Sequence, residues 1–167
     1  MTIILVANCF NYYMVCMQVK YFPGGDFETN NIYLYLSDIP ASLLAGVLIY
    51  KISAKALFFS GFCLQVITGL AIVFMVNPSE PTWTLPALVC AARLGNVFTF
   101  TASLIIHPKM FPTLFATTSL GIANFAAISI ALTAPIVAEN DFPTPMLIFT
   151  ISNMVAALVS LFLKEEK

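Results

Sequence analysis

Two ionisable residues, Asp38 and Arg93, lie deep within apolar stretches of this sequence. A charge at the centre of a lipid bilayer costs about 2.5–3.5 kcal/mol on insertion scales, so each side chain must face protein or water. One interpretation is a substrate or proton site in which Asp38 holds a cation, with Tyr35 and neighbouring tyrosines as an aromatic cage. A second is a structural Asp38–Arg93 pair inside a helix bundle, and a third places Arg93 against another subunit. An aromatic belt at the membrane surface is the other explanation of the tyrosines.

The apolar stretches that carry these residues are long enough to cross lipid. Of the 167 residues, 60% are hydrophobic and 9% are charged, whereas a soluble domain carries about 25% charge. A spanning helix needs about 20 mostly apolar residues, and polar or proline-containing breaks divide the chain into stretches of this length. We therefore expect an all-α membrane protein in a lipid bilayer. Its six predicted transmembrane helices cover residues 2–19, 31–50, 56–76, 83–106, 112–137 and 143–163.

The six predicted helices divide into two units of three. Residues 1–76 form the first unit and residues 83–163 the second, joined by residues 77–82 with a proline-containing breaker at 77–81. Three helices followed by three in the opposite orientation make a 3+3 inverted repeat, which is common in transporters. The whole chain, residues 1–167, is thus expected to be a single six-helix transmembrane domain.

Charged residues in the predicted loops favour one orientation. Lysine and arginine mark the cytoplasmic or matrix-equivalent side of a membrane, and an even number of spans puts both termini on one side. We expect that side to be the basic one. The basic side carries Lys51, Lys55, His107, Lys109, Lys164 and Lys167, and the opposite side carries Asp26, Glu28, Glu80, Glu139 and Asp141 with the base Lys20.

Several other residue types are explained by helix packing. Five glycines, Gly46, Gly61, Gly69, Gly95 and Gly121, are expected to let helices approach closely. Mid-helix Asn96, Asn124 and Asn153 are expected to make hydrogen bonds between helices, and Pro40 to kink its helix. The four cysteines, which lie in apolar runs without metal-site spacing, are interpreted as packing residues. They are Cys9, Cys16, Cys63 and Cys90.

Other function classes are disfavoured by what the sequence lacks. It has one histidine and no nucleophile elbow, phosphate loop or HExxH motif, so we expect no enzyme, no metal and no cofactor. A formal net charge of −1 offers no basic surface for nucleic acid.

Local motifs resemble the organic cation/anion transporter branch of the major facilitator superfamily. Residues 31–44 place Asp38 two positions before a proline, as in that family's eighth helix, and residues 109–116 (KMFPTLFA) resemble its E-L-Y-P-T-x-x-R motif before the eleventh helix. Pro135 and Pro143 also fall where the family has prolines. The resemblance spans essentially the whole chain but matches only the C-terminal six of the family's twelve helices. It implies half of a major facilitator fold, in which substrate binds between two six-helix halves.

The charged positions of these motifs are changed. The family's glutamate falls at Lys109 and its arginine at Ala116, while its D-R-x-G-R-R turn, at residues 50–55, keeps only basic character. Its terminal L-P-E-T is replaced at residues 163–166 by LKEE. In the family these charges form a network that is made and broken as the two halves move.

The lost network and the half size together predict a non-transporting structural or accessory subunit of a larger membrane protein complex, partnered by other membrane subunits. Two alternatives remain open. One is a half-size transporter of small organic ions that works as a dimer or with a partner chain. The other is the C-terminal half of a longer transporter. The mitochondrial inner membrane is the expected location, from the type of complex and not from a targeting signal.

Overall fold

The computed structural model describes residues 1–18, 20, 27–75, 84–141 and 143–163 of the chain. These residues form helices joined by turns, and no strand occurs among them. Within this part of the chain, four helices are long and apolar enough to cross a membrane, and two shorter apolar helices accompany them. The expectation of an all-α chain with membrane-compatible helices is confirmed at this level.

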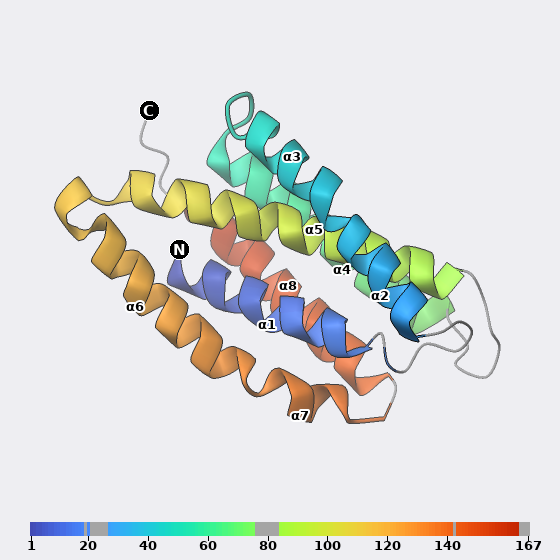
Figure 1. Ribbon diagram of the computed structural model, residues 1–167. Coiled ribbons are helices and arrows are strands. Elements are labelled where there is room, and N and C mark those ends of the chain that lie inside the picture. Colours follow the sequence, from blue (N-terminus) through green and yellow to red (C-terminus); the bar gives the residue numbers. More distant parts are fainter. Residues whose placement is uncertain (19, 21–26, 76–83, 142, 164–167) are drawn as a thin grey trace.

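The helices of each expected three-helix unit differ in continuity. The first and third helices of each unit are single, whereas the second is divided in two. In chain order the elements in Figure 1 are α1 (Thr2–Gln18), α2 (Phe27–Leu36), α3 (Asp38–Leu48), α4 (Ala54–Met75), α5 (Thr84–Ile106), the 3₁₀ turn η2 (His107–Met110), α6 (Thr113–Ala131), α7 (Ala134–Ala138) and α8 (Thr144–Leu161).

Prolines account for both divided helices. α2 ends at Leu36, four residues before Pro40, and α6 ends at Ala131, four residues before Pro135. A proline has no N–H for the carbonyl four residues earlier, and its ring clashes with that carbonyl. The helix therefore stops at the residue that loses its hydrogen-bond donor.

Hydroxyl side chains help to close both interrupted turns. Ser37 donates a hydrogen bond to the carbonyl of Leu34 at 2.6 Å, and Thr133 donates one to the carbonyl of Ile130 at 2.7 Å. Each hydroxyl thus binds a carbonyl three residues earlier in the chain, next to the break.

These interruptions correct two predicted helices. The helix predicted over residues 31–50 begins earlier, at Phe27, and is divided at Ser37, while the one predicted over residues 112–137 is divided after Ala131. Hydropathy does not detect such breaks because apolar residues continue on both sides of them. The kink predicted for Pro40 is a break in the helix, and it lies in the turn before the proline, at Ser37.

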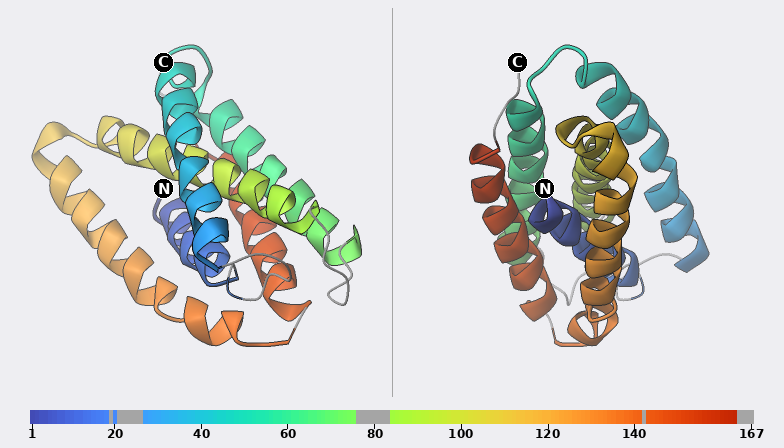
Figure 2. Two further views of the ribbon diagram at one scale, coloured as in Figure 1. Left: turned by 45° about the vertical axis from the view of Figure 1, so that its right-hand side comes forward. Right: turned by 90° about the vertical axis from the view of Figure 1, so that its left-hand side faces the viewer.

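α1 lies at the centre of the bundle. It packs against α5, α6, α7 and α8, and Figure 1 shows α6 and α7 running along one side of it. The right-hand view of Figure 2 places α4 and α8 on one side of α1 and the pair α2 and α3 on the other. α1 buries Asn8 and Asn11 fully, so the centre of the bundle is polar as well as apolar.

Close helix packing depends on three of the five glycines. A Cβ atom added at Gly61 or Gly95 would press on the facing helix across the α4–α5 contact, and one at Gly69 would press on α8. The same role was predicted for Gly46 and Gly121, and that prediction is wrong within the described chain. No atom lies within 4 Å of a Cβ built at either position.

The described charges at the two ends of the bundle differ in sign, apart from Lys20, which follows α1. α1 begins and α8 ends at the same end (Figure 1). Lys51 and Lys55, in and after the α3–α4 turn, and Lys109 in η2 belong to this end, while Glu139 and Asp141 lie between α7 and α8 at the other. Several sequence predictions fall outside the described residues: the breaker at 77–81, Asp26, Glu80, Lys164 and Lys167.

Candidate functional site

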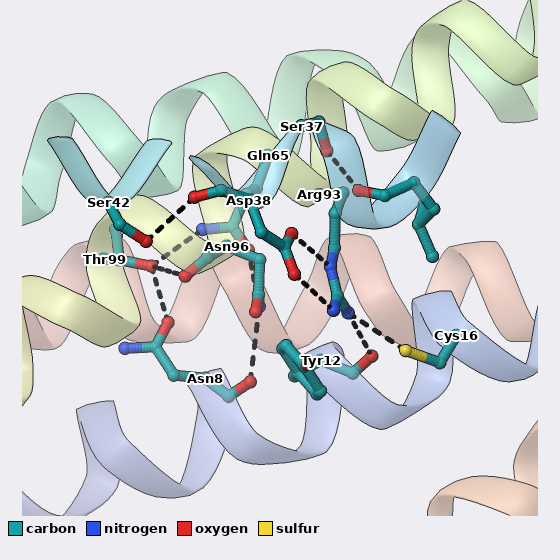
Figure 3. Close-up of polar contacts among 11 residues, drawn as sticks. Asn8, Tyr12, Cys16, Ser37, Asp38, Ser42, Gln65, Arg93, Asn96 and Thr99 are labelled. Carbon is teal, nitrogen blue, oxygen red and sulfur yellow. Dashed lines mark hydrogen bonds and ion pairs between the residues drawn. The ribbon is translucent and has the colours of Figure 1, made fainter. Parts of the chain in front are cut away.

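Asp38 and Arg93 form an ion pair that joins α3 to α5. In Figure 3 the guanidinium meets the carboxylate at two points, with Nε donating to Oδ1 at 2.9 Å and Nη2 donating to Oδ2 at 3.0 Å. The Arg93 side chain is 0% exposed and the Asp38 side chain is 24% exposed. Two parallel hydrogen bonds between planar groups strengthen the pair and fix the orientation of the two side chains. The structure thus brings the two ionisable candidates together.

The broken helix explains why a carboxylate is held at this position. Because Pro40 interrupts the segment, α3 begins at Asp38, whose side chain lies in the first turn. The unpaired N–H groups of a helix N-terminus favour an acidic side chain. α3 also lies close to α5 because Ala41 and Ala45, both 0% exposed, are small. These features bring the carboxylate within reach of Arg93.

α1 supplies the remaining contacts of the guanidinium. Nη1 of Arg93 donates to the carbonyl of Tyr12 at 3.2 Å and to Sγ of Cys16 at 3.0 Å. Cζ of Arg93 lies 3.6 Å from the centroid of the Tyr12 ring, which is a cation–π contact. All three nitrogens of the guanidinium are therefore engaged, and their partners come from both α1 and α3.

The sequence analysis did not predict that Tyr12 and Cys16 contact Arg93. The cysteine was interpreted as a packing residue, and the tyrosine as part of an aromatic belt or cage. Asn8, Tyr12 and Cys16 follow one another at intervals of four residues on α1, and this spacing places them on one face of a helix. That polar row was the signal that could have pointed to them.

Tyr35, the third predicted binding residue, lies at the rim of the ion pair. Its ring centroid is 5.7 Å from Cζ of Arg93, and the residue is 53% exposed. The hydrogen bonds of Arg93 go to other residues, so Tyr35 stands beside the pair without completing it.

A second polar cluster lies where α1, α4 and α5 meet. Thr99 donates to Oδ1 of Asn8 at 2.7 Å, and Nδ2 of Asn96 donates to Oε1 of Gln65 and to the carbonyl of Asn8, both at 3.3 Å. Nε2 of Gln65 donates in turn to Thr99 at 3.2 Å. All four residues are 0% exposed. Hydrogen bonds of this kind join helices where lipid offers no alternative partner.

A third cluster joins α1 to α8. Nδ2 of Asn11 donates to Oδ1 of Asn153 at 2.8 Å, and Ser152 donates to Oδ1 of Asn11 at 2.7 Å. The interhelical hydrogen bonds predicted for Asn96 and Asn153 are therefore confirmed. The one predicted for Asn124 is wrong for the described residues, where its side chain makes no hydrogen bond.

The turn after α3 and the 3₁₀ turn η2 also meet. Nζ of Lys109 in η2 lies 5.4 Å from the centroid of the Tyr50 ring, just beyond α3. A lysine above an aromatic ring makes a cation–π contact, so this pair links η2 to the end of α3.

The chemistry open to the site follows from these bonds. Arg93 has no exposed surface left, whereas the Asp38 carboxylate keeps free acceptor positions because its two oxygens offer about four lone pairs. No group of three or more His, Cys, Asp or Glu side chains gathers in the described part of the chain. The site can accept a further hydrogen bond at Asp38.

Comparison with known proteins assigns no family. No protein-family model matches this chain, and no curated protein matches its sequence.

Proposed function

We propose that this chain is an integral membrane protein that crosses the bilayer six times as a 3+3 inverted repeat, and that it serves as a non-transporting structural or accessory subunit of a larger membrane protein complex. In this proposal α2 with α3, and α6 with α7, each make one crossing. The architecture is that of half a major facilitator transporter.

The pattern of helix contacts supports the repeat. Exchanging the two units pairs α1 with α5, α2 and α3 with α6 and α7, and α4 with α8. The contacts of α1 with α6 and α7 then correspond to those of α5 with α2 and α3, and the contact of α1 with α8 corresponds to that of α4 with α5. The two remaining major contacts, α1 with α5 and α4 with α8, map onto themselves. An internal two-fold relation predicts this pattern.

Two amide pairs follow the same correspondence. Asn11 binds Asn153 across the α1–α8 contact, and Asn96 binds Gln65 across the corresponding α5–α4 contact. The middle helix of each unit is also the one that a proline divides. These features support two units of one architecture in a single domain.

The observation that carries the non-transporting role is the full burial of Arg93 in its two-point ion pair with Asp38. A substrate cation would have to displace a fully buried guanidinium that is held by α1 and α3 together. Removing one partner of a buried pair costs about 3–5 kcal/mol. A pair of this kind suits a structural tie between helices better than a site that opens in every transport cycle.

A half-size transporter of small organic ions is the second candidate. One observation favours it: Asp38 and Tyr35 are both partly exposed, and both lie next to the guanidinium of Arg93. A cation approaching there would meet a carboxylate edge and an aromatic ring, and a dimer or a partner chain would supply the other wall of the path.

The proposal includes an orientation and a location. We place both termini on the cytoplasmic or matrix-equivalent side, because Lys51, Lys55 and Lys109 lie toward the end of the bundle where α1 begins and α8 ends. The mitochondrial inner membrane is the proposed location of the complex.

The test is uptake of labelled tetraethylammonium into liposomes that contain the purified chain. We expect no saturable uptake above that of protein-free liposomes, and no difference between the unmodified chain and D38N. Saturable uptake by the unmodified chain would establish the transporter instead. In parallel, a mild detergent extract of the native membrane should contain the chain in an assembly larger than itself on a native gel.

A further inference from the structure

Two side-chain atoms of the polar cluster between α1, α4 and α5 have no partner. Nδ2 of Asn8 and Oδ1 of Asn96 are buried and make no hydrogen bond within the described chain. Both residues are 0% exposed, and Figure 3 shows Nδ2 of Asn8 pointing away from Arg93 without a contact. A buried polar atom without a partner is costly and rare in folded proteins. The cluster therefore needs a further acceptor at Asn8 and a further donor at Asn96.

Turning either amide over does not remove this need. Nδ2 of Asn96 donates to two oxygens, the side-chain oxygen of Gln65 and the carbonyl of Asn8, so an oxygen in its place would find no donor there. Turning the amide of Asn8, whose Oδ1 accepts from Thr99, would put an oxygen where Nδ2 now lies, and that oxygen would need a donor instead. An amide has both donors and acceptors to satisfy, so an outside partner is required in each orientation.

The cluster between α1 and α8 provides a comparison. In both clusters an asparagine on the first helix of one unit donates through Nδ2 to the side-chain oxygen of an amide on the third helix of the other unit. Asn11 donates in this way to Asn153, and Asn96 donates to Gln65. The two clusters therefore correspond residue by residue at the amide pair.

One cluster contains a hydroxyl group that the other lacks. Ser152, which precedes the amide on α8, donates to Oδ1 of Asn11 at 2.7 Å. The residue that precedes the amide on α4 is Leu64, whose side chain has no donor for Oδ1 of Asn96. The unpartnered oxygen of Asn96 thus corresponds to the oxygen that accepts a hydroxyl group in the other cluster.

Water is the ligand whose size and chemistry match both unpartnered atoms. Its O–H group supplies the donor that Oδ1 of Asn96 lacks, and its oxygen supplies the acceptor that Nδ2 of Asn8 lacks. Buried waters in proteins typically make about three hydrogen bonds to polar groups of this kind. A larger ligand would have to open the bundle, because all four residues of the cluster are 0% exposed.

The other unpartnered buried side-chain atoms of the described chain are both ring nitrogens of His107. His107 follows Asn96 by about three helical turns, and its ring stacks on Phe111 with the centroids 4.9 Å apart. Its nitrogens therefore lie too far away to share a ligand with the cluster.

We propose that ordered water is bound inside the bundle where α1, α4 and α5 meet, accepting a hydrogen bond from Nδ2 of Asn8 and donating one to Oδ1 of Asn96. This water takes the place of the Ser152 hydroxyl of the other cluster. A water-mediated hydrogen bond is nearly as favourable in enthalpy as a direct one, so the water joins α1 to α5, the first helices of the two units. The inference rests on the correspondence between the units in the proposed function and adds a bound ligand to it.

The test is nuclear magnetic resonance of the purified chain in mixed micelles, with isotope-labelled side-chain amides. Transfer of magnetisation from water to the amide protons detects water in contact with them. We expect this transfer at the Nδ2 protons of Asn8 and Asn96. Asn11 is the matched control and should show no transfer, because it is also 0% exposed and both polar atoms of its amide have protein partners.

Two substitutions exchange the properties of the two clusters. L64S supplies a hydroxyl group next to Gln65 and should abolish the transfer to Asn96, because the hydroxyl displaces water from Oδ1. S152A removes the hydroxyl group beside Asn11, so transfer to Asn11 should appear. Both variants are expected to fold, since Leu64 is 38% exposed and Ser152 is only partly buried; circular dichroism checks this.

The outcomes separate this inference from the proposed function. Absence of transfer to Asn8 and Asn96 in the unmodified chain, or equal transfer to Asn11, would overturn the bound water. Transfer to Asn96 that L64S leaves unchanged, or no transfer to Asn11 in S152A, would overturn its assignment as the counterpart of the Ser152 hydroxyl. All of these results would leave the subunit role intact. That role fails instead if the unmodified chain is extracted from its native membrane as a monomer without any partner.

Discussion

The ion pair between Asp38 and Arg93 predicts a strongly non-additive pair of substitutions. D38N leaves Arg93, which is 0% exposed, with its charge uncompensated and takes away the carboxylate that accepts two of its hydrogen bonds. A stranded buried charge costs about 3–5 kcal/mol. We therefore expect D38N to lower the free energy of unfolding by about 3 kcal/mol or more.

The converse substitution is expected to cost less. R93M leaves a carboxylate that is 24% exposed and can meet water or take up a proton. It also removes an arginine whose insertion into lipid costs about 2.5–3.5 kcal/mol. In the double variant D38N/R93M neither charge remains. It should be more stable than D38N alone by about 2 kcal/mol, because neutral residues can replace a buried ion pair without loss of stability.

The measurement is the free energy of unfolding of all four proteins in mixed micelles, titrated with a denaturing detergent and followed by circular dichroism. A double variant whose loss equals the sum of the two single losses would refute the reasoning, because additive effects mean independent sites. Such a result would show that the two side chains do not stabilise each other.

Two further substitutions test the packing. G61L should lower the free energy of unfolding by about 2 kcal/mol, because a Cβ atom at this position already meets Thr99. G46L is the control in the purified chain, because a Cβ atom there meets no atom within 4 Å. Equal losses of stability in the two variants would contradict the close contact at Gly61. H107F should raise the midpoint of thermal unfolding, by a free energy of about 1 kcal/mol, because His107 is 1% exposed and neither ring nitrogen has a hydrogen-bond partner among the described residues. A lower midpoint would mean that the imidazole has a partner after all.

The extent of the helices could be predicted because hydropathy is a local property. Long apolar runs lie between polar or proline-containing segments, and the helices α4, α5 and α8 follow those runs. The two internal helix breaks could not be predicted from hydropathy, since apolar residues continue through them. Steric reasoning about Pro40 and Pro135 would have placed each helix end four residues earlier, at Leu36 and Ala131.

The candidate site was predictable only in part. Charge in an apolar run singled out Asp38 and Arg93, but their contact depends on how α3 crosses α5, which no local pattern reports. Tyr12 and Cys16 were missed because a single sequence does not tell which face of α1 meets protein and which meets lipid. The substrate-binding role of Asp38, Arg93 and Tyr35 stays a prediction.

The interleaved packing of the two units has a consequence for biosynthesis. α1 finds its neighbours in α5, α6, α7 and α8, all of which leave the ribosome after it. In the proposed six-span topology, α1 therefore waits in the membrane during translation, with Asn8 and Asn11, 0% exposed in the finished fold, still facing lipid or the insertion machinery. Contacts between residues distant in the chain form late and slow folding. A nascent chain stalled after α4 should for this reason be a substrate for membrane quality control and not a stable half.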